Sequence, residues 1–211
     1  MDTIKVYSAS ELKESFPSGF ESAHKHWQED HAGDIFWSDE IMDSMKAIFK
    51  TTGVNLISWD ISDSSPCWVK FTIPTYYSEL ADCDMLVDDY TGKKALNWLK
   101  AELGIKSVKR VKYSYENESG RKVNGVRYDV TKTNGESWDC ELTGVCYDHD
   151  FIDSLLEDIH NGKTLNESFS GLADKAGKLF EAEYQDQMSE SYFVDHADSN
   201  EYQYTESGVM V

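Results

Sequence analysis

Residues 105–142 read IKSVKRVKYSYENESGRKVNGVRYDVTKTNGESWDCEL, and this stretch decides the expected fold class. Valines and tyrosines recur at alternate positions, a pattern that is typical of β-strands. The turn residues Asn117–Gly120 interrupt the pattern once, and Asn134-Gly135 is the strongest short-range hairpin signal in the chain. The stretch therefore predicts a three-stranded antiparallel meander whose third strand covers 136–143.

Upstream of the meander, apolar spacing and helix caps predict four helices and one hairpin. The first helix opens with a capping box, because the Ser8 hydroxyl and the Glu11 carboxylate can satisfy each other's backbone amides. The predicted helices cover 8–16, 18–31, 38–53 and 91–103, and the predicted hairpin joins strands 54–62 and 67–73.

Downstream of the meander, the pattern is helical. Asp148 is expected to cap a helix that ends near Ile159. Thr164 and Glu167 form a second capping box, which opens a long helix reaching about Gln187. A short helical segment and a terminal hairpin, or a strand with a turn, complete the chain.

The expected architecture is one α+β domain over residues 1–211. The hairpin and the meander supply an antiparallel sheet packed with several helices, and the C-terminal third is helical. A division into a helix and hairpin part, 1–104, and a meander and acidic helical part, 105–211, is an alternative.

The composition describes a folded but strongly acidic protein. Hydrophobic residues make up 40% of the 211 residues, which is enough to bury a core, and the formal net charge is −19. This charge disfavours direct binding to nucleic acid or to anionic lipid. The sequence shows neither a signal peptide nor an apolar run of about 20 residues, which indicates the cytoplasm. Its cysteines are then expected to be reduced packing residues: Cys67, Cys83, Cys140 and Cys146.

The charge is unevenly distributed along the chain. Residues 1–99 carry −9, residues 100–132 carry +5 and residues 133–211 carry −15. The stretch 140–160 alone holds six carboxylates and no lysine or arginine. The basic segment can meet the acidic end within one chain or across a two-fold axis, so a homodimer is compatible with the sequence but not required by it.

No metal or cofactor site is predicted. His24 and His31 share a helix face about two turns apart and His26 points elsewhere, whereas zinc ligands on a helix are typically spaced i, i+4. The cysteines are separated by 16, 57 and 6 residues, which is not a zinc pattern either. One acidic cluster lacks the glycine and the ligand spacing of a calcium loop: Asp82, Asp84, Asp88 and Asp89.

Catalytic motifs are also missing from the sequence. There is no G-x-S-x-G, no phosphate-binding loop and no cysteine beside a suitable histidine. Asp148-His149-Asp150 could form an acid–base site, but three polar residues that open a helix are more simply its cap and first turn. The chain is therefore predicted not to be an enzyme.

Three stretches carry a resemblance to a known family: FWSDEIMDSMKAIFKTTGVNLISWDIS (36–62), ELTGVCYDHDFIDSLLEDI (141–159) and SESYFVDHADSNEYQYTESGVMV (189–211). They resemble a family of small acidic bacteriophage proteins of unassigned activity, sometimes loosely labelled antitoxin-like. The sequence departs from the family at Pro17–Gly19, where an uninterrupted helix is usual. The resemblance implies a phage accessory protein, acting in the host bacterial cytoplasm, that blocks a host defence or neutralises a toxin by binding.

The acidic last third supplies the candidate partner-binding residues. Glu167, Asp174 and Glu181 recur every seven residues, so on one helix they form a line with a spacing of roughly 10 Å. Tyrosines among carboxylates suit contact with an arginine-rich surface. The predicted site comprises Asp150, Asp153, Glu157, Asp158, Glu167, Asp174, Glu181, Glu183, Asp186, Glu190, Tyr192 and Tyr202.

Two functions are consistent with this surface. The first is a non-enzymatic phage inhibitor of a host nucleic-acid-handling defence complex, of the anti-CRISPR or anti-restriction type, which binds the complex's basic surface as a nucleic-acid mimic. The alternative is an antitoxin-like protein that covers one specific toxin through its apolar-aromatic tail, 190–211. The expected partner is a host protein or ribonucleoprotein with a basic surface.

Overall fold

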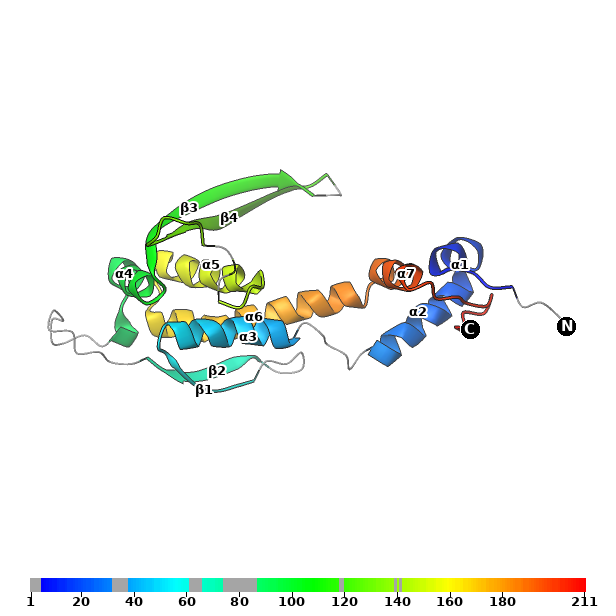
Figure 1. Cartoon of the computed structure of the whole chain (residues 1–211), viewed down its shortest axis with the longest axis horizontal. Coiled ribbons are helices and arrows are strands. Elements are labelled where there is room, and N and C mark those ends of the chain that lie inside the picture. Colours follow the sequence, from blue (N-terminus) through cyan, green and yellow to red (C-terminus); the bar gives the residue numbers. More distant parts are fainter. Residues whose placement is uncertain are drawn as a thin grey trace. The chain divides into compact units, whose positions relative to one another are not determined.

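The computed structural model describes residues 5–31, 38–60, 66–73, 87–117, 120–138, 140 and 142–211. Its contacts divide the chain into two compact units. The terminal unit comprises residues 1–38 and 180–211, and the central unit comprises residues 39–179. The expected alternative boundary after residue 104 lies inside the central unit. In Figure 1 the terminal unit contains colours from both ends of the sequence scale, blue for residues 5–31 and orange to red for residues 180–211.

The central unit contains two pairs of consecutive strands, which are separated by helices along the chain. Its elements are α3 (Ser38–Thr51), β1 (Asn55–Asp60), β2 (Trp68–Thr72), the short 3-10 helix η1 (Val87–Asp89), α4 (Gly92–Glu102), β3 (Ile105–Glu116), β4 (Lys122–Lys132), α5 (Tyr147–His160) and the first part of α6 (Leu165–Gln187). Figure 1 shows the β3–β4 ribbon beside α5, and β1–β2 beside α3.

The core of the central unit includes one apolar face of α3, whose helix was predicted over 38–53. Ile41, Met45, Ile48 and Phe49 are all buried. Phe49 packs edge-on against Phe169 of α6, with the ring centroids 5.3 Å apart. Helical spacing places these side chains on one face, so burying that face stabilises the helix far more than its intrinsic propensity does.

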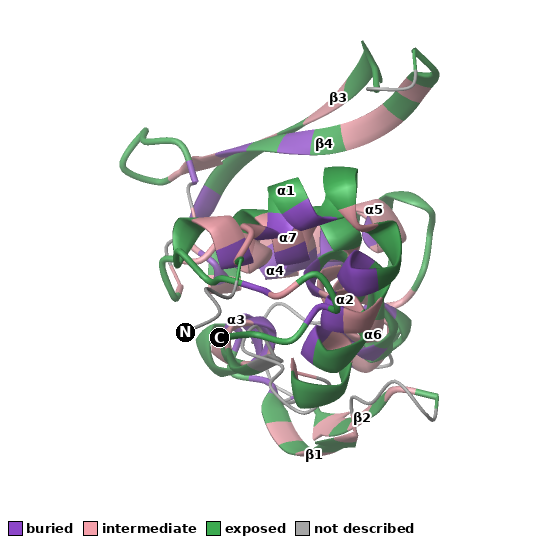
Figure 2. Cartoon of the chain, turned by 90° about the vertical axis from the view of Figure 1, so that its right-hand side faces the viewer, coloured by how far each residue is buried: buried purple, intermediate pink, exposed green. Residues whose placement is uncertain are grey.

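The strands form two separate antiparallel pairs, β1–β2 and β3–β4. The predicted hairpin is confirmed by β1–β2, and burial alternates along both strands (Figure 2). The prediction of one sheet that includes a three-stranded meander is wrong. Among the described residues, the segment after β4 makes only a single bridge, between Thr131 and Ser137.

A side chain explains why the third strand does not form. The carboxylate of Asp148 accepts hydrogen bonds from the backbone amides of Leu142 and Thr143, each at 2.8 Å. These amides lie in the segment that was expected to pair as a strand, and a side-chain acceptor competes with a strand ladder for them. Cys140, with a positive φ of 37°, already turns the backbone out of the extended region.

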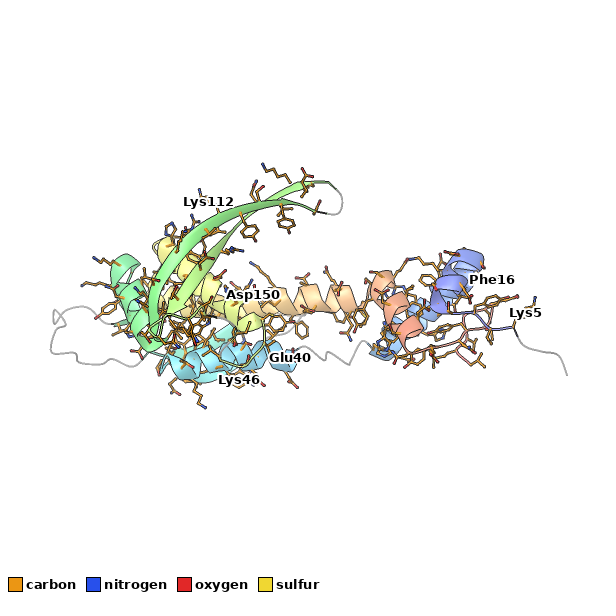
Figure 3. The ribbon with its side chains drawn as sticks, turned by 45° about the horizontal axis from the view of Figure 1, so that its top comes forward. Lys5, Phe16, Glu40, Lys46, Lys112 and Asp150 are labelled. Atoms are coloured by element: carbon orange, nitrogen blue, oxygen red, sulfur yellow. The ribbon has the colours of Figure 1, made fainter. Side chains whose placement is uncertain are left out.

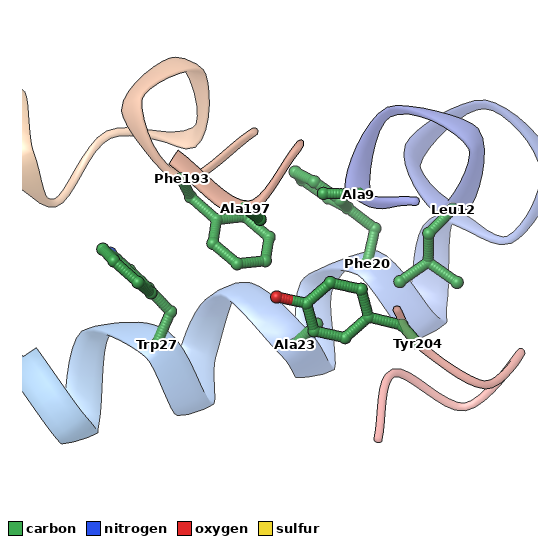
Figure 4. Packing of buried hydrophobic residues seen from close by; sticks show 8 residues of the cluster. All are labelled: Ala9, Leu12, Phe20, Ala23, Trp27, Phe193, Ala197 and Tyr204. Atoms are coloured by element: carbon green, nitrogen blue, oxygen red, sulfur yellow. The ribbon is translucent and has the colours of Figure 1, made fainter. Parts of the chain in front are cut away.

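The terminal unit is helical. It contains α1 (Ala9–Ser15), α2 (Pro17–His31), the end of α6, α7 (Glu190–Ser199) and the tail 200–211. The Ser8 and Glu11 capping box is present as predicted. Figure 4 shows the hydrophobic core that these elements share: Ala9, Leu12, Phe20, Ala23, Trp27, Phe193, Ala197 and Tyr204.

The tail is held against α2 by two glycines. A Cβ atom on Gly208 would collide with the backbone oxygen of Gly19, and a Cβ atom on Gly19 would collide with the backbone oxygen of Glu206. Tyr7 and Tyr204 exchange backbone hydrogen bonds of 2.9 Å, which pair the start of the chain with the tail. Only glycine permits so close a backbone approach.

Candidate partner-binding surface

The acidic face of α5 is largely engaged within the central unit. Glu157 receives two hydrogen bonds from the Arg110 guanidinium, at 3.1 and 2.8 Å, and a third from the Tyr128 hydroxyl at 2.5 Å. The Arg110 and Tyr128 hydrogen bonds lower the pKa of Glu157 to about 2. Burial and the bond to Glu157 raise the pKa of Tyr128 to about 12. Glu157 therefore serves to join α5 to the β3–β4 ribbon.

The other predicted carboxylates of α5 also have partners. Asp158 pairs with Lys163 at 2.8 Å and Asp150 pairs with Lys175 at 3.5 Å. Asp153 is half-buried and lies 3.6 Å from the His149 ring. Burial raises the pKa of Asp153. Figure 3 shows Asp150 on α5 and Lys112 on the neighbouring ribbon.

The three acids that were predicted to form a line along α6, Glu167, Asp174 and Glu181, do not form one surface. Glu167 forms the predicted capping box, accepting from the Thr164 amide at 2.8 Å, and this bond lowers its pKa. Asp174 is exposed and makes no ion pair with any described residue. Glu181 belongs to the terminal unit, whereas Glu167 and Asp174 belong to the central unit. The row therefore gives no continuous surface within either unit.

The remaining predicted residues lie in the terminal unit. Glu190 pairs with Lys13 at 2.9 Å, which lowers its pKa, and Glu181 accepts from Gln185 at 3.2 Å. Asp186 is exposed and Glu183 half-exposed, with no ion pair among the described residues. The two predicted tyrosines differ in exposure, since Tyr192 is half-buried and Tyr202 is exposed.

The terminal unit is the more acidic of the two units. The sequence gives it 15 acidic residues and three lysines, a formal charge of −12, which leaves −7 for the twice-longer central unit. Two of the three lysines are already paired, Lys13 with Glu190 and Lys25 with Glu29 at 3.8 Å. Most of the described carboxylates of this unit therefore form no ion pair with a described lysine or arginine.

Sequence reasoning missed the contribution of the first 38 residues to this surface. Five exposed acids of α1 and α2 join the acids of α6 and α7 in one unit: Glu11, Glu14, Glu21, Glu29 and Asp30. The sequence does indicate an acidic N-terminal segment, because residues 1–38 contain seven acidic residues and three lysines. The pairing of the two chain ends was not visible in the sequence.

The terminal unit also contains an apolar pocket of about 320 Å³. It lies between α2, α7 and the tail. Val209 and Met210, at its edge, are each 60% exposed. The pocket is lined by Ala23, His26, Trp27, Asp30, His31, Phe193, Tyr202, Tyr204, Gly208, Val209 and Met210.

Asp148 has a structural role and not the expected capping role. The helix α5 begins at Tyr147, with Cys146 as its N-cap, so Asp148 lies inside the first turn. Asp148 is fully buried and also accepts from the Thr143 hydroxyl at 2.9 Å. All these bonds come from the preceding loop, which indicates that Asp148 fixes the loop to the helix.

Within the part of the chain that the structure describes, no group of three or more histidine, cysteine or acidic side chains is placed to hold a metal ion. Asp82 and Asp84 of the acidic cluster, with Cys83 and Glu141, lie outside the described residues. None of the described helices is both long enough and apolar enough to span a bilayer. No family model, curated protein or solved structure matches this chain.

Proposed function

We propose that the chain is a non-enzymatic phage accessory protein whose terminal unit binds the basic surface of a host nucleic-acid-handling defence complex. Binding inhibits the complex by competing with its nucleic acid. The observation that carries this proposal is the charge of −12 on the terminal unit, which contains only three lysines. Carboxylates without internal cations are available to the lysines and arginines of a partner.

Electrostatics support a partner of this type. Channels that hold nucleic acid gather lysine and arginine side chains, and an acidic protein body is attracted to the same side chains. Such attraction speeds encounter and weakens as salt rises, because the screening length is only about 8 Å at physiological ionic strength. The resemblance to acidic phage proteins favours a host defence complex as the target.

The proposal depends on the total charge of the terminal unit and not on phosphate-like spacing. The regular row of Glu167, Asp174 and Glu181 is divided between the units, and Glu167 is engaged as a helix cap. A mimic of successive phosphates along one helix therefore gains no support from the fold. A broad acidic body that occupies a basic channel is what the arrangement favours.

The antitoxin-like alternative is favoured by the exposed apolar tail. Val209, Met210 and Val211 are 60%, 60% and 71% exposed, and the first two border the pocket. Deleting 190–211 is a poor test of this alternative, because it removes Phe193 and Tyr204 from the core. Replacing Val209 and Met210 with aspartate tests it without removing a helix. Loss of toxin neutralisation in that variant would favour the alternative.

Two matched variants test the proposed function. The terminal variant carries the changes Glu21→Lys, Asp186→Lys and Asp195→Lys. The central variant carries Asp39→Lys, Asp89→Lys and Asp174→Lys. All six side chains are exposed and form no ion pair with any described residue, and the two variants change the net charge equally.

The measurement is the plating efficiency of a defence-sensitive phage on bacteria that express each variant beside a restriction or CRISPR system. Wild type and the central variant are expected to raise plating, and the terminal variant to lose most of this effect. Capture of the defence complex from lysate should weaken steeply between about 50 and about 500 mM salt. Equal loss in both variants, or no effect of wild type on plating, contradicts the proposal.

A further inference from the structure

The pocket of the terminal unit has an apolar floor and a polar edge. Its floor includes Trp27 and Phe193, whose ring centroids are 5.7 Å apart, and the buried Tyr204. Figure 4 shows these rings grouped between α2, α7 and the tail. A volume of about 320 Å³ is near the lower end for ligand pockets, so it suits one or two side chains better than a large cofactor.

The polar edge of the pocket offers hydrogen-bond acceptors. Asp30 contributes an exposed carboxylate. The Nδ1 atoms of His26 and His31 lie 2.8 and 2.9 Å from backbone carbonyls of α2. Because a carbonyl can only accept, each Nδ1 must carry the hydrogen, and in that tautomer Nε2 carries the lone pair of the ring.

The charge around the pocket favours a cationic ligand. Among the residues that the structure describes, no lysine or arginine lines the pocket, and the unit as a whole carries −12. A ligand with a carboxylate or phosphate would meet acceptors and negative charge. A ligand with ammonium or guanidinium groups would find the acceptors that it needs.

We infer that this pocket receives one large aliphatic or aromatic side chain from a basic segment of the partner, while Asp30 and the two imidazoles bind the cations that flank it. This inference rests on the proposed function and names the chemistry of the partner segment. It also gives a role to Val209 and Met210, whose exposed side chains would be covered by the inserted residue. Buried apolar anchors inside a polar rim are where interfaces concentrate their binding energy.

The test uses the full chain and two fluorescein-labelled peptides rich in lysine and arginine. One peptide has a single central leucine, and the other has alanine at that position. Fluorescence anisotropy at low salt measures both dissociation constants. The leucine peptide is expected to bind about tenfold more tightly, the usual effect of burying a leucine side chain. An acidic peptide with the same central leucine is expected not to bind.

Two tail variants localise the effect. Met210→Glu changes a residue that lines the pocket, and Val211→Glu adds the same charge at a neighbouring exposed residue that does not line it. Met210→Glu is expected to abolish the preference for leucine over alanine, and Val211→Glu to retain it. Both side chains are more than half exposed, so neither change disturbs the core.

The outcomes separate the inference from the proposed function. If leucine and alanine peptides bind equally and both weaken with salt, the pocket inference is overturned while docking through charge stands. If neither basic peptide binds at low salt, docking through charge fails as well. Self-association in sedimentation that Met210→Glu abolishes would assign the pocket to a second copy of the chain and overturn the inference.

Discussion

The terminal and central units use the same kind of residue in opposite ways. In the central unit the acidic helix α5 lies beside the basic β3–β4 ribbon, and Glu157 is held by Arg110 and Tyr128. The Asp148 carboxylate accepts hydrogen bonds from backbone amides of the loop that precedes α5. In the terminal unit 15 acidic residues share three lysines. Several carboxylates stabilise the central unit internally, whereas most of those described in the terminal unit have no lysine or arginine partner there and are available to a partner protein.

A run of acids along the chain does not locate a binding surface. The stretch 140–160 is dense in carboxylates, yet its members Asp148, Asp150, Glu157 and Asp158 all have partners inside the central unit. The available charge is instead assembled from both ends of the chain. Whether an acid is free depends on which cations the fold places beside it.

The largest expected effect comes from breaking the terminal unit alone. Gly208→Ala places a Cβ against the backbone of Gly19 at a φ of 83°. We expect it to lower the free energy of unfolding of this unit by about 3 kcal/mol or more, because backbone strain and overpacking add. Hydrogen exchange should then rise in α1, α2 and α7, while α3 and α5 stay protected.

The matched control is Gly162→Ala. Gly162 has nearly the same φ, 86°, but no atom lies within 4 Å of the added Cβ. Only the backbone strain remains, and the expected cost is about 1 kcal/mol. Equal losses from the two variants would show that the approach of the tail to α2 does not hold the terminal unit together.

A change of intermediate size tests the role of Asp148 in the central unit. Asp148→Ala removes the acceptor of two backbone amides and one hydroxyl. It is expected to lower the free energy of unfolding by about 2 kcal/mol, measured by urea denaturation. Asp150→Ala removes only a half-exposed ion pair and should cost less than about 1 kcal/mol. A larger cost for Asp150→Ala would mean that the loop is fixed in another way.

The smallest expected effect is a change in acid sensitivity. The Arg110 and Tyr128 hydrogen bonds hold the pKa of Glu157 near 2, below its ordinary value of 4.5. A lowered pKa means that the unfolded chain takes up the proton first. The stabilising contribution is therefore complete above about pH 4.5 and is lost as the pH falls towards 2.

Glu157→Gln should remove this contribution. The variant is expected to be about 1 kcal/mol less stable than wild type at neutral pH, and the difference should shrink as the pH falls from about 5 to about 3. Urea midpoints of both proteins across that range measure the difference, in which the acid response of all other groups cancels. A difference that stays constant with pH would contradict the role assigned to the Glu157 pKa.

Most individual helices could be predicted from the sequence because their signals are local. The Ser8 and Glu11 box and the Thr164 and Glu167 box both form as expected. The hairpin β1–β2 was predicted from the alternating residue pattern of its strands, and burial alternates along both strands in the structure. Each of these features depends on residues a few positions apart, so the chain carries the information within one short stretch.

The candidate site was less predictable. Tyr202 borders the pocket as a member of the predicted set, but Asp30 and Trp27 of α2 were not expected beside it. The prediction of a third strand in the meander was wrong because the Asp148 carboxylate accepts hydrogen bonds from the amides of Leu142 and Thr143. No propensity scale contains that competition, since it depends on where a side chain is carried by its own helix.

The helices, the capping boxes at Ser8 and Thr164, the β1–β2 hairpin and the total charge of −19 follow from the sequence alone. Which of the described carboxylates pair with a cation depends on the tertiary structure. Local hydrogen bonds and apolar spacing act over a few residues, whereas charge pairing acts wherever the fold brings side chains together. The close backbone approach of Gly19 and Gly208 likewise joins residues that are far apart in the sequence.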